Sequence, residues 1–461
     1  MKRTATTFLI FLLLGGTMMN TCAGEIQFKT RALWVDTSGF TTAKATDKMI
    51  AQCQRAGINM ILPEVFCYQT TYFKSPHFKG SVAANDDFDA LACLLRQAHA
   101  AQIQVQAWCC VYYEGGEEPS NLEWRDLSFD GKPFEKNWLS AANPEVNPYL
   151  LSVFKDLLAY DIDGIHLDYI RYPCTAFDYS PPARKAFQAA AGFDPQNFLD
   201  HPDKIVSPAK EPYPVRVLHA KSHIEKIWKT TAIERTLDAA HVGFAFISES
   251  PENIVALRSP GLLIMSAYEE VTEPMLQAIR EFAGRGGDVL WSDPPFAALK
   301  KFPALGELLG IREGKWLGSR HVGLLPASGD SLSKQLGTNE FFTSVNCATQ
   351  LAGAAAVARF DGGEPAVTLN RIGKGRVLVL GFDAMDCKAG RSIPLLQRIV
   401  GWFRNESKIA APDVLGEKRA EWIQWRDDQV TQLVRNISLA AKAKNPNVMV
   451  TSSGGPGAWE F

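Results

Sequence analysis

Short apolar runs alternate with helical patterns through the first half of the chain, and no other feature constrains its fold as strongly. The first helical segment has Thr46 as its expected N-cap, the second is striped from Phe88, and Pro144 opens the third. Strands joined by such helices lie parallel, with right-handed crossovers. The pattern predicts an α/β fold, either a doubly wound sheet or a (β/α)8 TIM barrel. The four expected strands are residues 31–36, 59–65, 104–111 and 163–168.

The residues at the strand ends help to choose between these folds. In α/β proteins ligands bind at the carboxyl ends of the strands, and in a barrel these ends converge on one pocket. Residues 37–40, after the first strand, read TSGF, which is no phosphate-binding glycine motif, so a nucleotide cofactor has no support. The barrel type is therefore predicted. The side chains that bury poorly at these ends are Asp36, Glu64, Trp108 with the nearby Tyr112 and Tyr113, and His166 with Asp168.

A second α/β pattern begins after a Pro-rich stretch of mixed charge at 194–214, which indicates a domain boundary. The pattern covers about 225–405 and includes a hairpin over 367–381 and a last helix over 393–403. Its other expected strands are residues 241–247, 262–265 and 286–291.

This second block contains Gly286-Gly287 before a strand and a late Gly373-Lys374-Gly375 strand that ends in Gly381-Phe382-Asp383. In these features it resembles the flavodoxin-like, class I glutamine-amidotransferase-like domain found in many glycosidases. Catalytic members of that class carry a cysteine at a strand-to-helix elbow, where this chain reads WSDP at 291–294. Amidotransfer is therefore not expected. The block is interpreted as a structural or oligomerising module, with ligand sensing as the alternative.

The barrel pattern resumes after this insertion, with a long helix that includes Trp422 and Ile437 and a fifth strand at 447–450. A (β/α)8 barrel needs three more strands. Either the sequence is truncated, or something else completes the sheet. The expected domains are a signal peptide at 1–24, the first part of the barrel at 25–200, the insertion at 225–405 and the barrel continuation at 418–461.

The N-terminus has the order of a secretory signal, with Lys2 and Arg3 before an apolar run and small residues up to Gly24. The protein is therefore expected to be exported, in the periplasm or outside the cell. A membrane anchor is expected only if Cys22 is lipidated. The formal net charge of −2 gives no positive excess for binding nucleic acid. No cysteine falls in a CxxC pair or a zinc-type cluster, so no metal is expected.

Glycoside hydrolysis requires two carboxyl groups, one that donates a proton and one that acts as nucleophile or activates water. Asp168 and Glu64 are the candidate pair, although a carboxylate at a strand end is also a common acceptor of loop hydrogen bonds. His166 shares a strand face with Asp168. Trp108 is a candidate platform for a sugar ring, whereas Trp34 is expected to be buried, with stacking on a sugar as its alternative.

Three further positions complete the candidate substrate-binding region, and a nearby loop offers an alternative acid. Asp36 and Tyr113 stand at strand ends. Arg171 either orients a substrate carboxylate or pairs with Asp178. A Gly-containing loop over the expected pocket, solvated by default, is an alternative source of the acid; its carboxyl groups are Glu114, Glu117 and Glu118.

The stretch YDIDGIHLDYIRYP at 160–173 is highly specific, and RALWVD at 31–36, WLSAANPEV at 138–146 and WR at 425–426 accompany it. Together these segments resemble the glycosyl-hydrolase-like family 10, also called DUF187. The resemblance implies a TIM-barrel glycosidase, exported or lipid-anchored in bacteria, some of whose relatives cut peptidoglycan glycan strands that lack stem peptides. It places the family's motif aspartate at Asp168 and its motif arginine at Arg171.

Two segments depart from the family pattern: PEVF at 63–66 and CCVYY at 109–113. They alter the pocket, so the family's substrate is not carried over. The sequence predicts an exported glycoside hydrolase that acts on a polysaccharide or on peptidoglycan glycan, without a cofactor, and that could form a homo-oligomer through the insertion. The alternatives are a non-catalytic carbohydrate-binding protein and an inactive fragment of a glycosidase.

Overall fold

The computed structural model describes residues 29–453, except 86, 117, 222–226, 267, 319, 330, 344–346, 386–392 and 406–413. The expected signal peptide and Cys22 lie outside the described residues. Within them, no helix is long and apolar enough to cross a membrane. The chain divides into two compact units. The first comprises the described residues up to Cys110 with Lys155–Asp168 and Ala440–Ser453, and the second comprises Val111–Phe154 and Tyr169–Leu439.

The first unit is built on a sheet whose five parallel strands lie side by side in chain order. β2 pairs with β1 and β5, β5 pairs with β8, and β8 pairs with β20. A doubly wound sheet would place its first strand in the interior, so this order is of the barrel type and confirms the predicted fold class. In the described part of the chain the sheet stays open. Its strands are β1 (Ala32–Val35), β2 (Met60–Cys67), β5 (Gln104–Cys110), β8 (Gly164–Asp168) and β20 (Met449–Ser452), with the short β3 (Thr70–Thr71) and β4 (Ser81–Val82) beside β2.

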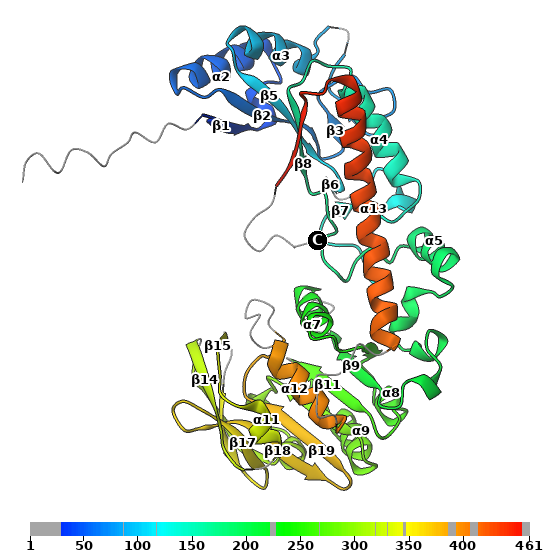
Figure 1. Cartoon of the computed structure of the whole chain (residues 1–461), viewed down its shortest axis with the longest axis vertical. Coiled ribbons are helices and arrows are strands. Elements are labelled where there is room, and N and C mark those ends of the chain that lie inside the picture. The colour runs from blue at the N-terminus through cyan, green and yellow to red at the C-terminus, as the bar shows by residue number, and fades with distance from the viewer. Residues whose placement is uncertain are drawn as a thin grey trace, which may run out of the picture. The chain divides into compact units, whose positions relative to one another are not determined.

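Two helices lie on one side of this sheet, and polar caps set where they begin (Figure 1). α2 (Ala43–Arg55) follows Thr42, whose hydroxyl accepts a hydrogen bond from the amide of Ala45. α3 (Ala90–Ala100) follows Asp89, which caps it in the same way. The prediction of Thr46 as the cap of α2 is wrong. The helix begins one turn earlier, and Thr46 is buried inside it, where its hydroxyl donates to the Thr42 carbonyl.

The second unit contains a nine-stranded sheet. Its parallel part has the order β10-β9-β11-β12-β19, the flavodoxin-like order in which the second strand lies outside the first. The first strand, β9, was not predicted, because it directly follows the Pro-rich stretch that was interpreted as a boundary. The strands are β9 (Val215–His219), β10 (Ala245–Ser248), β11 (Leu262–Ser266), β12 (Asp288–Ser292) and β19 (Gly375–Leu380), continued by antiparallel β18 (Pro365–Ile372), β17 (Ala355–Phe360), β14 (Arg320–Pro326) and β15 (Asn339–Thr343).

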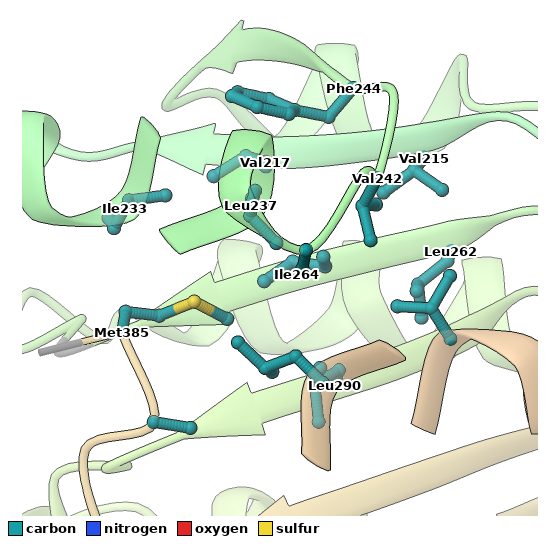
Figure 2. Packing of buried hydrophobic residues seen from close by; sticks show 14 of the residues in the cluster. Val215, Val217, Ile233, Leu237, Val242, Phe244, Leu262, Ile264, Leu290 and Met385 are labelled. Carbon is teal, nitrogen blue, oxygen red and sulfur yellow. The ribbon is translucent and has the colours of Figure 1, made fainter. Parts of the chain in front are cut away.

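Alternate residues of the parallel strands enter two separate cores. Leu262 and Ile264 of β11 pack in one core, and Leu263 and Met265 in the other. Figure 2 shows the first core, where Ile264 faces Leu237 of α7. Because both faces are covered, the strands read as continuous apolar runs. The helices are α7 (Ile227–Ala239), α11 (Ser331–Leu336) and α12 (Ile393–Phe403) around the first core, and α8 (Pro251–Val255), α9 (Glu273–Gly284) and α10 (Pro303–Leu309) around the second.

The predicted hairpin is present as β18 and β19. Gly373 in its turn has a φ of 58°, and a Cβ there would lie 2.7 Å from the carbonyl oxygen of Gly284, so only glycine fits. The other elements of the second unit are α5 (Pro181–Ala191), the pairs β6 (Tyr113–Gly115) with β7 (Asn137–Trp138) and β13 (Ile311–Trp316) with β16 (Cys347–Leu351), and the 3-10 helices η2 (Leu122–Trp124), η3 (Pro195–Phe198), η4 (Pro202–Lys204), η5 (Pro208–Lys210) and η6 (Phe296–Lys300). The third barrel helix and the predicted long helix are α4 (Val146–Leu157) and α13 (Val414–Lys444).

Candidate active site

The carboxyl ends of the strands in the first unit bring polar and aromatic side chains onto one face of the sheet. Register partners on parallel strands point to the same side. The first row of register partners consists of Glu64 on β2, Trp108 on β5, His166 on β8 and Thr451 on β20, each paired with the next. Two residues further along the strands, Cys110 of β5 is the partner of Asp168 of β8.

Asp168 is held by an indole group. The Nε1 of Trp108 donates a hydrogen bond of 3.0 Å to Oδ2 of Asp168. The Trp108 ring is half-buried, and its one polar atom points to the carboxylate.

The Glu64 carboxyl group lies in a buried environment. Only 9% of the residue is exposed, and this burial raises the pKa of its carboxyl group. The negative charges of Asp168 and Asp36 raise that pKa further, whereas side-chain hydrogen bonds with Cys67 and Cys110 lower it. The Sγ of Cys110 lies 3.6 Å from Oε1 of Glu64. The net effect is upward, so Glu64 retains a proton more readily than an exposed glutamate does.

His166 lies between two hydroxyl groups. Its Nδ1 is 2.9 Å from Oγ1 of Thr451, and its Nε2 is 2.9 Å from Oγ of Ser453. Burial lowers the pKa of the imidazole, and the charge of Asp168 acts in the other direction. The net shift is downward, which favours the neutral ring at neutral pH.

Trp34 meets the His166 ring edge-on, with 5.9 Å between the ring centroids. The prediction that Trp34 is buried is wrong, since 58% of the residue is exposed. The reason is its place in the sheet: β1 pairs only with β2 in the described part of the chain, so no neighbouring strand covers its other edge.

Asp36 follows β1 and caps the 3-10 helix η1 (Thr37–Gly39). Its Oδ1 accepts hydrogen bonds from the amide of Ser38 over 2.9 Å and from the Ser38 hydroxyl over 2.5 Å. These bonds give Asp36 a local structural role. Its charge also acts on Glu64.

Tyr113 and Arg171 belong to the second unit, where they share an aromatic cluster. Tyr113 stacks on Tyr169 with 4.7 Å between centroids, and Trp138 meets both rings edge-on. The Arg171 guanidinium lies 5.3 Å from the centroid of Trp138 and 5.6 Å from that of Tyr169. The structure therefore brings these two candidate residues together through two aromatic rings.

The basic group that acts on Asp178 is Arg426 rather than Arg171. Burial raises the pKa of Asp178 to about 6, and the charge of Arg426 opposes this shift. Asp178 also accepts hydrogen bonds from the Ser140 hydroxyl and from the amide of Ala142. The charge that acts on the buried Asp178 therefore comes from a residue of α13.

The loop carboxyl groups differ from one another. Glu114 is buried and accepts hydrogen bonds from the amide and hydroxyl of Ser120, so it is not solvated as expected. Glu118 is exposed, and Glu117 lies outside the described residues.

Sequence reasoning missed four residues of the first unit's face: Cys67, Cys110, Thr451 and Ser453. One signal was available for Thr451 and Ser453: they are two residues apart after the fifth predicted strand, so their side chains point to the same face. The two cysteines give no such signal, because a buried S–H group acts as a donor only where the sheet places an acceptor beside it. In the part of the chain that the structure describes, no group of three or more His, Cys, Asp or Glu side chains is arranged to hold a metal ion.

Comparisons with known proteins connect the chain only to solved structures. No family model matches it, and no curated protein does. A cold-adapted β-galactosidase from Rahnella sp. R3 is 15% identical with a TM-score of 0.34, and the match covers 67% of this chain and 45% of that one. The α-L-fucosidase isoenzyme 2 from Paenibacillus thiaminolyticus is 12% identical with a TM-score of 0.31, covering 82% and 84%. A ThuA-like protein from Parabacteroides merdae is 12% identical with a TM-score of 0.33, covering 43% and 93%. This chain thus spans less than half the length of the β-galactosidase that it matches.

Proposed function

We propose that the first unit hydrolyses glycosidic bonds, with Glu64 as the general acid and Asp168 as the nucleophile or the base that activates water. The observation that carries this proposal is the pair of carboxyl groups on one sheet face, Glu64 buried and Asp168 held by an indole N–H. Burial raises the pKa of Glu64, which suits it to the role of the acid. Glycoside hydrolysis needs such a pair.

The two environments support these roles. The N–H group of Trp108 orients the Asp168 carboxyl group that would act as nucleophile or base. Burial and neighbouring negative charge hold the proton on Glu64, as a general acid requires. One strand, β5, separates β2 from β8, so their backbones lie about 10 Å apart. Side chains from these two strands can flank a glycosidic bond between them.

The neighbouring rings support a sugar as the substrate. Trp34 offers an exposed indole face, and the apolar C–H face of a pyranose stacks on such a surface. The neutral His166 lies beside it between two hydroxyl groups, in a setting suited to hydroxylated ligands.

We further propose that the substrate is a polysaccharide or peptidoglycan glycan and that the protein acts after export. The resemblance of residues 160–173 to glycosyl-hydrolase-like family 10 and the signal-like N-terminus support these finer assignments. The second unit is proposed as an oligomerising module, on the basis of its flavodoxin-like sheet without a nucleophile at 291–294.

A cleavage assay tests the proposal. The substrates are 4-nitrophenyl β-glycosides, a β-linked polysaccharide and peptidoglycan glycan strands without stem peptides. Asp168→Asn is expected to lower kcat/KM about 10²–10⁴-fold on every substrate that the wild type cleaves. Glu64→Gln is expected to impair cleavage of the glycans far more than that of the 4-nitrophenyl glycosides, because nitrophenolate leaves without protonation.

The matched control is Asp161→Asn, since the Asp161 side chain is 92% exposed in the same unit. It should cleave like the wild type. Unchanged cleavage by Asp168→Asn would remove Asp168 from the mechanism. Glycan binding by the wild type without cleavage of any substrate would support the rival, a non-catalytic carbohydrate-binding protein.

A further inference from the structure

We infer that Cys67 and Cys110 are positioning residues, whose thiols hold the Glu64 carboxyl group in place as weak donors and so leave it able to carry its proton. This inference rests on the proposed function only for the role of Glu64 as the acid. The hydrogen bonds themselves are features of the fold.

A β-bulge explains how two cysteines reach one carboxyl group. Glu64 is the register partner of Trp108, but Phe66 is the partner of Cys109, so β2 contains one residue more than β5 over this interval. The extra residue reverses the alternation of side chains along β2. Cys67 consequently lies on the same face as Glu64. It is three positions further along the chain, where unbroken alternation would place it on the opposite face.

Cys110 approaches the same carboxyl group from the neighbouring strand. It lies two residues beyond Trp108 on β5, hence on the same face, and its Sγ is 3.6 Å from Oε1 of Glu64. The Cys67 thiol makes a further hydrogen bond with Glu64. Thiols from two adjacent strands therefore converge on one buried carboxyl group.

The thiols act as donors and remain protonated. Both cysteines are 2% exposed, and burial raises the pKa of each thiol well above its ordinary range. The nearby charge of Glu64 raises these pKa values further. Neither cysteine is therefore suited to be a nucleophile, which would require the thiolate.

An S–H group is a weak hydrogen-bond donor. Two such bonds orient the carboxyl group but compensate little for the loss of hydration of its charged form. A hydroxyl at the same place would bind the carboxylate more strongly and favour release of the proton. A thiol thus fixes the orientation of the carboxyl group while favouring loss of its proton less than a hydroxyl would.

The other groups that act on Glu64 come from two further strand ends. Asp168, at the end of β8, and Asp36, after β1, both add negative charge. Their charge and the burial raise the pKa of Glu64, and the two thiols oppose the rise. Changing a thiol should therefore shift the titration of Glu64 in a direction that depends on the replacement.

Infrared difference spectroscopy of the full chain measures this titration without a substrate. The carbonyl stretch of the protonated carboxyl group is followed against pH, and the Glu64→Gln spectrum is subtracted to isolate Glu64. In Cys110→Ser the midpoint should fall by roughly one pH unit, and in Cys110→Ala it should rise, because the first strengthens a donor and the second removes it. Cys67→Ser and Cys67→Ala should show the same opposite pair of shifts.

Cys93→Ser is the matched control. Its Sγ already accepts hydrogen bonds from Arg96 and Gln97 on the surface of α3, so a hydroxyl is tolerated there and the Glu64 midpoint should not move. Thermal denaturation of each variant verifies that it is folded. Equal midpoints in folded Cys110→Ser, Cys110→Ala and wild type would overturn the inference, as would a shift of both variants in one direction.

The kinetic readout separates this inference from the proposed function. If the protein cleaves a glycan, whose leaving group needs protonation, the alkaline limb of kcat/KM against pH should follow the infrared midpoint in each variant. If the midpoints move in opposite directions but no variant or wild type cleaves anything, the positioning role stands and the hydrolase function fails. An alkaline limb that stays fixed while the midpoints move would remove Glu64 as the acid.

Discussion

The indole nitrogen of Trp108 donates a hydrogen bond of 3.0 Å to the carboxylate of Asp168 on the neighbouring strand. The two residues do not share a register row, since Trp108 is the partner of His166 and Asp168 is the partner of Cys110. The long indole therefore reaches along the sheet face to the next row. A rigid ring system with a single donor fixes the orientation of the carboxylate, and this link connects the packing of β5 to the chemistry proposed for β8.

Removal of this donor gives the first prediction. Trp108→Phe retains an aromatic ring but loses the N–H group. A hydrogen bond to a charged group contributes about 1.5–3 kcal/mol, so kcat/KM should fall roughly 10–100-fold, mainly through kcat. Steady-state kinetics on the cleaved glycan provides the measurement, and Asp161→Asn provides the unaffected reference. A rise in KM with kcat unchanged would instead indicate that Trp108 binds sugar.

Trp34 gives the second prediction. Because its indole is 58% exposed beside His166, Trp34→Ala should weaken glycan binding about tenfold, in line with loss of an aromatic contact of about 1–1.5 kcal/mol. The unfolding free energy should change little, since an exposed edge-strand side chain contributes little to the core. Isothermal titration calorimetry with the inactive Asp168→Asn background measures the affinity. Unchanged affinity together with lost stability would contradict this role.

The third prediction concerns the buried charges of the second unit. Arg426 is 3% exposed, donates to the carbonyls of Thr175 and Phe177, and opposes the raised pKa of Asp126 and Asp178. Arg426→Met keeps the apolar stem but leaves these groups without a counter-charge. The unfolding free energy should fall by about 3–5 kcal/mol at pH 8. It should fall less at pH 4.5, where Asp178, whose pKa is raised to about 6, is mostly neutral.

Denaturant titrations at the two pH values provide this measurement. Arg435→Met on the same helix is the control, because Arg435 is exposed. An equal loss at both pH values would mean that packing, rather than charge, accounts for the effect.

The fourth prediction concerns Asp293, at the elbow after β12, with a φ of 49°. Burial, and then the charge of Asp383, raise the pKa of Asp293 to about 7, while Lys229 acts in the other direction. The folded protein thus binds a proton that the unfolded chain releases near pH 4, so this group stabilises the fold at low pH and the contribution is lost as the pH rises from about 4 to 7.

Asp293→Asn should flatten that dependence by roughly 2–4 kcal/mol, because asparagine also tolerates a positive φ and carries no charge. The unfolding free energy measured at half-unit steps between pH 4 and 8 tests this. The exposed Asp361→Asn should leave the slope as it is in the wild type. A slope that is identical in Asp293→Asn and wild type would show that other groups cause it.

Several elements could be predicted from the sequence because their signals lie within a few neighbouring residues. The helix over 393–403 and the strand that begins at Gln104 stand where apolar periodicity placed them. The hairpin of β18 and β19 was recognisable from its glycine turn. In contrast, β9 directly follows a Pro-rich stretch, and Thr46 had the chemistry of a cap one turn inside the helix. Local chemistry permits more than one starting point for β9 and for α2, and only packing decides where each begins.

The candidate site also combines features that the sequence indicates with features that depend on tertiary structure. Its strand-end residues were identifiable as candidates because the carboxyl ends of parallel strands gather at one edge of a sheet, although a side chain there can also cap a loop, as Asp36 does. The exposure of Trp34 was not identifiable, since it depends on which strand lies beside β1. The role of Trp108 as a donor was equally hidden, because its partner is 60 residues away in the chain.

The sequence alone determined the alternation of strands and helices, and through it the parallel α/β class, because periodicity and capping act over a few neighbouring residues. Only the tertiary structure decided the chain order of the five strands, the bulge that turns Cys67 towards Glu64, and the partners of Asp168. The physical reason is that burial, hydrogen bonding and electrostatic coupling between strands depend on distances in space, which residues far apart in the chain acquire only when the sheet assembles.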